Sequence, residues 1–308
     1  MLDLSWERTI PIQSMQLDAI AAIMAAFDKS IEVTGWSAVR IGCKNSNFAV
    51  YTNKGMFLLR MTDKQGFNNE AAVHELVKSR VRVPALLYQA IWNHAGVFLY
   101  EFVQGVSLQR RIIRENRCAP NLLQQVAEAA AIIHSIPEHD TAHLAKLDVP
   151  PYAVWYQVFL EHPTTKRKMG DQLLARTHRL VSDKAAFLSV VDSHQTLIHN
   201  DFRPANMLVD RHDRVWFVDW EGAWRGHSLA DIGQFFRYRA FFQDAACQAF
   251  AQAYNAVSGI PLPQDWLDLS LFRDLVNLLQ LLSINQVAPQ RDADLLRILE
   301  GTLQHFGY

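Results

Sequence analysis

One short polar stretch of the chain holds residue types that suit phosphoryl transfer. His199, Asp201 and Asn206 follow the spacing H-x-D-x-x-x-x-N, and a second acid, Asp219, stands further along the chain. Asp201 can accept or orient the proton of an attacking hydroxyl group. Asn206 and Asp219 offer the hard oxygen atoms that Mg²⁺ prefers. We therefore predict that Asp201 is catalytic and that Asn206 and Asp219 ligate a metal ion.

Two apolar runs after Asn206 predict a β-hairpin. Residues 207–210 and 215–218 flank the polar break Arg211-His212-Asp213, the pattern of two strands joined by a short turn. Asn206 and Asp219 would then lie side by side at the two feet of the hairpin. Asp, Asn and Pro are also ordinary turn residues, so the motif alone would fit a structured turn. The motif, the strands and the second acid together favour a functional site.

Two other side chains of this stretch can contribute in different ways. Arg203 could donate its fork of N–H groups to a transferring phosphate, and we count it among the catalytic residues. An exposed arginine is also often no more than a solvated partner of an acid. We expect His199 to hold the loop together rather than to take part in the chemistry.

With these residues, the stretch resembles the aminoglycoside phosphotransferase and choline kinase group, which are small-molecule kinases with a protein-kinase-like fold. That group shows H-[GN]-D-x-x-x-x-N and then D-[WF]-E, matched here by Asn200 and by Asp219-Trp220-Glu221. The resemblance implies an α+β fold of two lobes, a small antiparallel-sheet N-lobe and a mostly helical C-lobe. We place a nucleotide-binding lobe with an N-terminal helix at residues 1–104. A helical lobe with the catalytic loop and the acceptor site follows at residues 105–308.

The same resemblance implies a set of nucleotide-binding residues upstream. A polar loop would cover the phosphates with Gly42, Asn45, Ser46 and Asn47. It departs from the protein-kinase pattern G-x-G-x-x-G, and by itself it would predict only a β-turn.

Arg60 ends an apolar run at the place where a protein kinase carries its phosphate-binding lysine. The resemblance implies that Arg60 contacts phosphate and that Glu70 pairs with it and holds it in place. Each residue also has a plainer interpretation. Arg60 could be a solvated edge-strand residue, and Glu70 an acid favoured near the N-terminus of a helix. Glu75 competes with Glu70 for the pairing.

Further along, Glu101 and Val103 fall in the segment that matches the family's interlobe hinge, where backbone groups bind adenine. Asp231 matches an aspartate that hydrogen-bonds the backbone of the catalytic loop. We expect His134 to be a packing residue rather than a ligand.

Composition narrows the class of protein. The chain has 308 residues, half of them hydrophobic, and a formal net charge of −1, which makes no case for nucleic acid or an anionic membrane as partner. The three cysteines have no C-x-x-C spacing, so we expect a reduced, cytoplasmic protein without disulfides or zinc. The first residues lack the basic start and apolar core of a signal peptide.

Apolar periodicity predicts the remaining elements. We expect a helix near 16–29, strands at 36–41, 48–52, 56–61, 85–91 and 97–102, and a helix that starts near Asn68. Beyond residue 104 we expect helices at about 122–133, 172–191, 238–257, 264–284 and 290–305. The aromatic segment 152–159 suits core packing, although it could also line an acceptor site.

These features predict an enzyme that uses ATP or GTP with Mg²⁺ to phosphorylate a hydroxyl group of a small molecule, as a monomer or weak dimer. The acceptor could be cationic, with Asp244, Asp265, Asp268 and Asp274 as a specificity patch or simply as a solvated face. One alternative is a metabolic kinase for choline, homoserine or a similar amino alcohol. Others are a nucleotide-binding pseudokinase regulator and a protein kinase. The protein kinase is disfavoured because Trp220-Glu221 stands where D-F-G would be.

Overall fold

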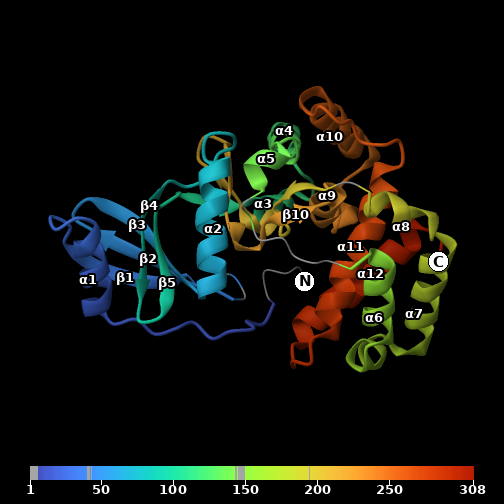
Figure 1. The fold of residues 1–308 in the computed structure, drawn as a ribbon, viewed down its shortest axis with the longest axis horizontal. Coiled ribbons are helices and arrows are strands. Elements are labelled where there is room, and N and C mark those ends of the chain that lie inside the picture. The colour runs from blue at the N-terminus through green and yellow to red at the C-terminus, as the bar shows by residue number, and fades with distance from the viewer. Residues whose placement is uncertain (1–5, 40–41, 43, 143, 145–149, 194) are drawn as a thin grey trace.

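The computed structural model describes residues 6–39, 42, 44–142, 144, 150–193 and 195–308. A β-sheet with helices α1 (Leu17–Phe27) and α2 (Lys64–Val77) lies at one end of the molecule, and mostly helices fill the other end (Figure 1). This arrangement confirms the predicted α+β fold class. No helix of the described part is long and apolar enough to cross a membrane.

The sheet is antiparallel and has five strands in the order β1-β2-β3-β5-β4. Their bounds are β1 (Val33–Val39), β2 (Ser46–Thr52), β3 (Gly55–Thr62), β4 (Leu86–Trp92) and β5 (Ala95–Glu101). The two tight hairpins turn where residues accept positive φ, at Gly55 (φ 110°) and at Asn93 and His94 (φ 45° and 68°), as such turns require. The strand predicted at 36–41 is present up to Val39, and residues 40, 41 and 43 lie outside the described part.

Helix α1 packs its apolar side onto this sheet. Ile20 and Met24 of α1 are fully buried against Phe48, Leu59 and Leu99 of the strands. Helix α2 starts at Lys64, earlier than predicted, and stands between the sheet and the helical half (Figure 1). The far end of α2 belongs to the other core, because Val73 and Val77 pack with residues of the helical half.

The chain passes from the first sheet to a second one within a few residues. Strand β5 ends at Glu101, and β6 (Gly105–Ser107) pairs with β8 (Met207–Asp210) in the three-stranded sheet β6-β8-β9. This sheet contains the predicted hairpin, with β9 (Val215–Phe217) as its second strand. A short pair, β7 (Thr196–Ile198) and β10 (Trp224–Gly226), flanks the loop between β7 and β8.

Helices make up the rest of this half. They are α3 (Leu108–Glu115), α4 (Pro120–His134), α5 (Glu138–Thr141), α6 (Tyr152–Glu161), α7 (Pro163–Asp183), α8 (Ala186–Val191), α9 (Leu229–Phe236), α10 (Asp244–Val257), α11 (Trp266–Ser283) and α12 (Pro289–His305). Helix α9 can pack closely on α11 because Gly233 has no Cβ atom. A Cβ atom at this position would clash with the Ser270 carbonyl. In α6, Tyr152 and Tyr156 are buried in the core, which supports the packing interpretation of that segment.

Two predictions about helices were wrong, and three helices were not predicted. The segment 172–191 is not one helix, because α7 begins at Pro163, kinks at Gly170 (φ 70°) and ends before Lys184. The helix predicted from 238 begins only at Asp244, after a 3-10 turn at Arg239–Phe241. Helices α3, α5 and α9 were not predicted. In the two wrong predictions the apolar side chains continue through the break, so periodicity alone did not reveal it.

Candidate active site

The hairpin brings Asn206 and Asp219 together as predicted. The Val218 N–H donates to the Asn206 carbonyl over 3.1 Å, so the two feet are joined by a backbone hydrogen bond. Asn206 ends a 3-10 turn that starts at Pro204. Asp219 adopts the left-handed conformation (φ 72°, ψ 57°), which turns the chain sharply after β9.

Asp201 lies at the centre of a small polar network on the same loop. Arg203 donates two hydrogen bonds to the Asp201 carboxylate, from Nε to Oδ1 and from Nη2 to Oδ2 over 2.8 Å. Asn206 Nδ2 donates to Asp201 Oδ2 over 2.6 Å and to its backbone carbonyl over 3.0 Å. Because its NH₂ group is held in this way, Asn206 is left with its amide oxygen for another ligand.

These contacts keep Asp201 ionised. Burial alone would raise the pKa of Asp201, but the adjacent Arg203 guanidinium, His199 and the Asn206 amide lower it to about 2. A carboxylate with so low a pKa is a weak proton acceptor at neutral pH. Asp201 is therefore better suited to orienting a hydroxyl group by accepting its hydrogen bond than to removing its proton early.

A buried acid holds the backbone of this loop. Asp231 is fully buried and accepts from the N–H groups of His199 and Asn200, both over 2.8 Å. These bonds are those expected of Asp231. Gln234, one turn further along α9, adds two more bonds, accepting from Phe202 N and donating to Asn200 O.

Two histidines support the loop. His199 Nε2 lies 3.0 Å from the Val218 carbonyl, so this side chain joins the loop to the residue that follows β9 and holds the loop together, as expected. His134 is buried between Asp231 Oδ2 (3.1 Å) and the Tyr254 hydroxyl (3.0 Å). The expectation that His134 only packs was incomplete, because it also hydrogen-bonds the acid that holds the loop.

Arg60 reaches the site from the five-stranded sheet. Its guanidinium is buried, with Nη2 on Asp219 Oδ1 and 3.4 Å from Glu221 Oε2. Its Nε lies 3.2 Å from Glu70 Oε2, an ion pair without hydrogen-bond alignment. Burial alone would lower the pKa of Arg60, but the carboxylates of Asp219, Glu70 and Glu221 raise it well above its usual value. The cluster places the predicted Arg60–Glu70 pair beside the predicted metal ligand.

The burial of Glu70 disfavours the charged form of its carboxyl group. Burial raises its pKa to about 7, although Arg60 acts in the opposite direction. The Tyr100 hydroxyl donates to Glu70 Oε1 over 2.8 Å. Glu75, the rival candidate, is exposed and pairs with Lys78, so it takes no part in the cluster.

Glu221 connects the loop that was predicted to cover the phosphates, here called the phosphate-covering loop (residues 42 and 44–47), to this cluster. It accepts from Asn45 Nδ2 over 2.7 Å and from Thr62 Oγ1 over 3.2 Å, and Lys44 Nζ lies 3.8 Å away. Burial alone would lower the pKa of Lys44, but Glu221, Asp63 and Asp219 raise it. Neither Glu221 nor Lys44 was predicted as a site residue. The D-[WF]-E pattern was the signal that could have identified Glu221.

The other residues predicted to bind the nucleotide lie at the two opposite ends of the five-stranded sheet. Gly42 has a positive φ of 105°, and strand β2 begins at Ser46. The Ser46 side chain is buried and accepts from Gln13 N, so it is occupied by the N-terminal segment. Asn47 lies in β2 directly opposite Arg60. At the other end of the sheet, the Glu101 side chain accepts from Ala85 N and Val103 is partly buried after β5.

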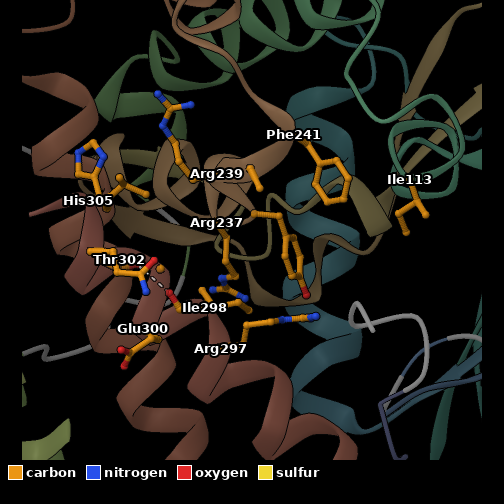
Figure 2. A pocket seen from close by; sticks show the side chains of 14 residues that line it. Ile113, Arg237, Arg239, Phe241, Arg297, Ile298, Glu300, Thr302 and His305 are labelled. Carbon is orange, nitrogen blue, oxygen red and sulfur yellow. Dashed lines mark hydrogen bonds between the residues drawn. The ribbon is translucent and has the colours of Figure 1, made fainter.

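A cavity of about 770 Å³ lies between α3, α11, α12 and the segment after α9. Its walls combine apolar side chains with three arginines, Arg237, Arg239 and Arg297. Figure 2 shows Arg237 and Arg297 in the middle, with Phe241 and Ile113 on one side and Thr302 and His305 on the other. The cavity begins three residues after Gln234, which holds the catalytic loop, and α3 packs against the turn that contains Asn206.

The four acids proposed as a cationic-acceptor patch do not line this cavity. Asp274 is buried in a two-bond pair with Arg237, and Asp244 pairs with Arg239. Asp268 pairs with His305, and Asp265 is exposed just before α11.

Comparisons with known proteins identify the family and the fold of the chain. A family model described as the phosphotransferase enzyme family matches residues 35–272. Among solved structures, spectinomycin phosphotransferase APH(9)-Ia, in complex with ADP and spectinomycin, is 14% identical. It has a TM-score of 0.68 and covers 95% of this chain and 100% of its own. A search of curated protein sequences found no significant match.

Two further structures share the fold. A thermostable mutant of aminoglycoside phosphotransferase APH(4)-Ia, in a ternary complex with AMP-PNP and hygromycin B, is 16% identical, with a TM-score of 0.66 over 94% of this chain and 99% of that one. A putative aminoglycoside phosphotransferase from Ralstonia eutropha is 15% identical, with a TM-score of 0.66 over 95% of this chain and 98% of that one.

The raised pKa of Glu70 leads to a prediction about stability. Because the folded-state pKa of about 7 lies above the reference value of 4.5, Glu70 stabilises the fold at low pH, and this contribution is lost as the pH rises through 7. Between pH 5 and pH 8 the wild type should therefore lose stability relative to Glu70→Gln, by at most about 3 kcal/mol in the free energy of unfolding. The loss is measured as a fall in the melting temperature of the wild type relative to that of Glu70→Gln. Glu75→Gln, on the exposed side of the same helix, keeps Glu70 and serves as the control, so its melting temperature should fall in parallel with that of the wild type. If the melting temperatures of the wild type and Glu70→Gln change with pH in parallel, the raised pKa of Glu70 is contradicted.

Proposed function

The chain belongs to the phosphotransferase enzyme family, and from that premise we propose that it transfers the γ-phosphate of ATP to a hydroxyl group of a small molecule. One observation carries the proposal. Arg60 of the sheet meets Asp219 of the hairpin, 159 residues away, beside the loop that holds Asp201. A cation that can bind phosphate, a carboxylate that can bind metal and a residue that can orient a hydroxyl group therefore converge in one place.

Asn206 and Asp219 fit Mg²⁺ by the chemistry of their atoms. The Asn206 amide oxygen and Asp219 Oδ2 have no hydrogen-bond donor among the described residues, although both side chains are otherwise held in place. Oxygen atoms of this kind, few in number and open to water and phosphate, are the usual ligands of Mg²⁺. When bound, the ion neutralises charge on the phosphates that it contacts.

The nucleotide would lie between the two sheets. Arg60 and Lys44 supply positive charge for phosphate oxygens, and the loop with Gly42 and Asn45 would cover them. Asn47, opposite Arg60 on the neighbouring strand, borders the same place. The backbone from Glu101 to Val103 would receive the base. We propose ATP as the nucleotide because two of the similar structures hold adenine nucleotides.

Asp201 would position the acceptor. Its carboxylate stays ionised, so it can accept a hydrogen bond from the attacking hydroxyl group and align that oxygen with the phosphorus atom. In the structure Arg203 is bound to Asp201 and also lies over the Trp6 ring. Arg203 would therefore act first by fixing Asp201, and its positive charge would also attract the transferred phosphate.

The arginine-lined cavity beside the catalytic loop is the proposed acceptor site. Its lining has three arginines and one acid, Glu300, and all four are ion-paired: Arg237 with Asp274, Arg239 with Asp244, Arg297 with Asp294 and Glu300 with Arg176. The lining therefore leaves no carboxylate without a partner for a cationic acceptor. Apolar side chains such as Phe241, Leu271 and Ile298 cover much of the remaining wall. We infer that the acceptor has an apolar portion and a neutral or acidic polar group, unlike the polycationic aminoglycosides. This lining also weighs against the amino alcohol kinase alternative.

Removal of the Asp201 carboxylate should abolish most of the turnover. For Asp201→Asn we expect a loss of about 10²- to 10⁴-fold in kcat, the usual contribution of such a group, with nucleotide affinity nearly unchanged. The rate of ADP release measures the first quantity and calorimetry the second. Asp213→Asn, at the tip of the hairpin that follows the loop, is the control and should retain activity. Full activity of Asp201→Asn would remove Asp201 from the mechanism.

Asp219 should carry the magnesium dependence of nucleotide binding. In the wild type, Mg²⁺ should tighten the binding of AMP-PNP by about tenfold or more, and Asp219→Asn should lose most of this gain. Calorimetry with Mg²⁺ and with EDTA makes the comparison, again with Asp213→Asn as the control. An equal magnesium effect in the wild type and Asp219→Asn would exclude Asp219 as a ligand.

The charge of the acceptor can be tested with matched polyols. Gluconate, glucose and glucosamine differ mainly in charge and can be compared in an ADP-release assay, together with kanamycin, choline, homoserine and aromatic hydroxy acids. We expect the highest kcat/KM for acidic or neutral compounds, by about tenfold or more over cationic ones. Turnover confined to kanamycin-like polycations would contradict this view of the cavity. Nucleotide binding without any turnover would favour a pseudokinase regulator.

A further inference from the structure

The segment before the first helix contacts both sides of the candidate active site. Residues 6–8, which we call the N-terminal strap, belong to the stretch that leads from α1 toward the helical half (Figure 1). No motif marked these residues as functional. Their contacts nevertheless join the phosphate-covering loop, the catalytic loop and helix α12.

Arg8 holds the phosphate-covering loop by its backbone. Its guanidinium donates to the carbonyl oxygens of Gly42, Lys44 (3.3 Å) and Asn45 (2.8 Å). A single fork that binds three carbonyls of one short loop restricts the conformations available to that loop. The Asn45 side chain is fixed in turn by Glu221, so the loop is held from both sides.

Glu7 anchors the strap to the far end of the chain. Its carboxylate accepts from the N–H groups of Gln290 (2.8 Å) and Arg291 (3.1 Å) in the first turn of α12, where helix N–H groups lack partners of their own. Gln286 Nε2 donates to the Arg8 carbonyl over 3.3 Å, which adds a third bond to this attachment.

Trp6 contacts the catalytic loop through Arg203. The Arg203 guanidinium lies 5.6 Å from the centre of the Trp6 ring, a cation–π arrangement. The indole N–H donates to Asp294 Oδ2 over 3.0 Å, and the hydroxyl of Tyr238, which lines the cavity, donates to the same oxygen over 2.8 Å. Trp6 is therefore fixed to α12 while its ring supports the arginine that grips Asp201.

We propose that the N-terminal strap is a positioning element of the phosphotransfer site. Arg8 sets the conformation of the loop that covers the phosphates, and Trp6 sets the position of Arg203 and, through it, of Asp201. Because the strap is hydrogen-bonded to α12, it fixes the phosphate-covering loop and the catalytic loop relative to each other. The effect on turnover rests on the proposed function, whereas the effect on the loop does not.

The two residues should affect different kinetic quantities. Arg8→Ala should raise the KM for ATP by about tenfold, the usual order for losing hydrogen bonds from a charged group, with a smaller change in kcat. Trp6→Ala should lower kcat by about tenfold and leave the KM for ATP nearly unchanged. Trp6→Phe keeps a ring beneath Arg203 and should recover much of the lost kcat. Arg80→Ala, which removes bonds to Leu76 O and Asp140 outside the site, is the control and should change neither quantity.

A measurement that needs no turnover separates this proposal from the proposed function. Amide hydrogen exchange over residues 42–47 should be faster in Arg8→Ala, and over residues 199–206 faster in Trp6→Ala, with melting temperatures close to the wild type. Calorimetry with Mg²⁺ and AMP-PNP should show weaker binding to Arg8→Ala alone. If exchange in both loops matches the wild type, the strap is only a tether and the proposal is overturned. A wild type that exchanges as expected but binds no nucleotide would overturn the proposed function and leave the strap assignment in place.

Discussion

The structure of the site depends on the burial of one positive charge. The Arg60 guanidinium is almost inaccessible to water, and a buried ion is tolerable only where opposite charges compensate its lost hydration. Three carboxylates do so, Glu70 from α2, Asp219 from the hairpin and Glu221 from the turn after it. These partners come from both halves of the chain, so the requirement to neutralise Arg60 also brings the sheet against the catalytic hairpin. The cluster has more negative than positive charge, and a magnesium ion beside Asp219 would correct that balance.

A second buried charge organises the catalytic loop. Asp231 accepts with both of its oxygens from backbone N–H groups of the loop, which fixes the course of the loop backbone. Asp201, Arg203 and Asn206 then bind one another. The two halves of the site are thus each prepared before any ligand arrives, and this preorganisation is the main way in which a protein assists phosphoryl transfer.

Much of this arrangement could be predicted from the sequence because it is local or repeats a known pattern. Asn206 and Asp219 were placed together by the hairpin pattern between them, and Arg60 was paired with Glu70 by resemblance. The break at Lys184 was missed because apolar residues continue on both sides of it. The contacts of Arg8 with residues 42–45 and of Glu7 with residues 290–291 join distant segments through backbone groups. Backbone groups leave no residue type to recognise, so no pattern could have indicated these contacts.

The central claim is that Arg60, Asn206 and Asp219 surround one magnesium nucleotide. The most direct test is a crystal structure of the protein with Mg²⁺ and AMP-PNP. We expect Mg²⁺ to be bound by the Asn206 amide oxygen and the Asp219 carboxylate at about 2.1 Å, with Arg60 in contact with phosphate oxygens. AMP-PNP bound away from this cluster, or bound beside it with no metal on Asn206 and Asp219, would contradict the account.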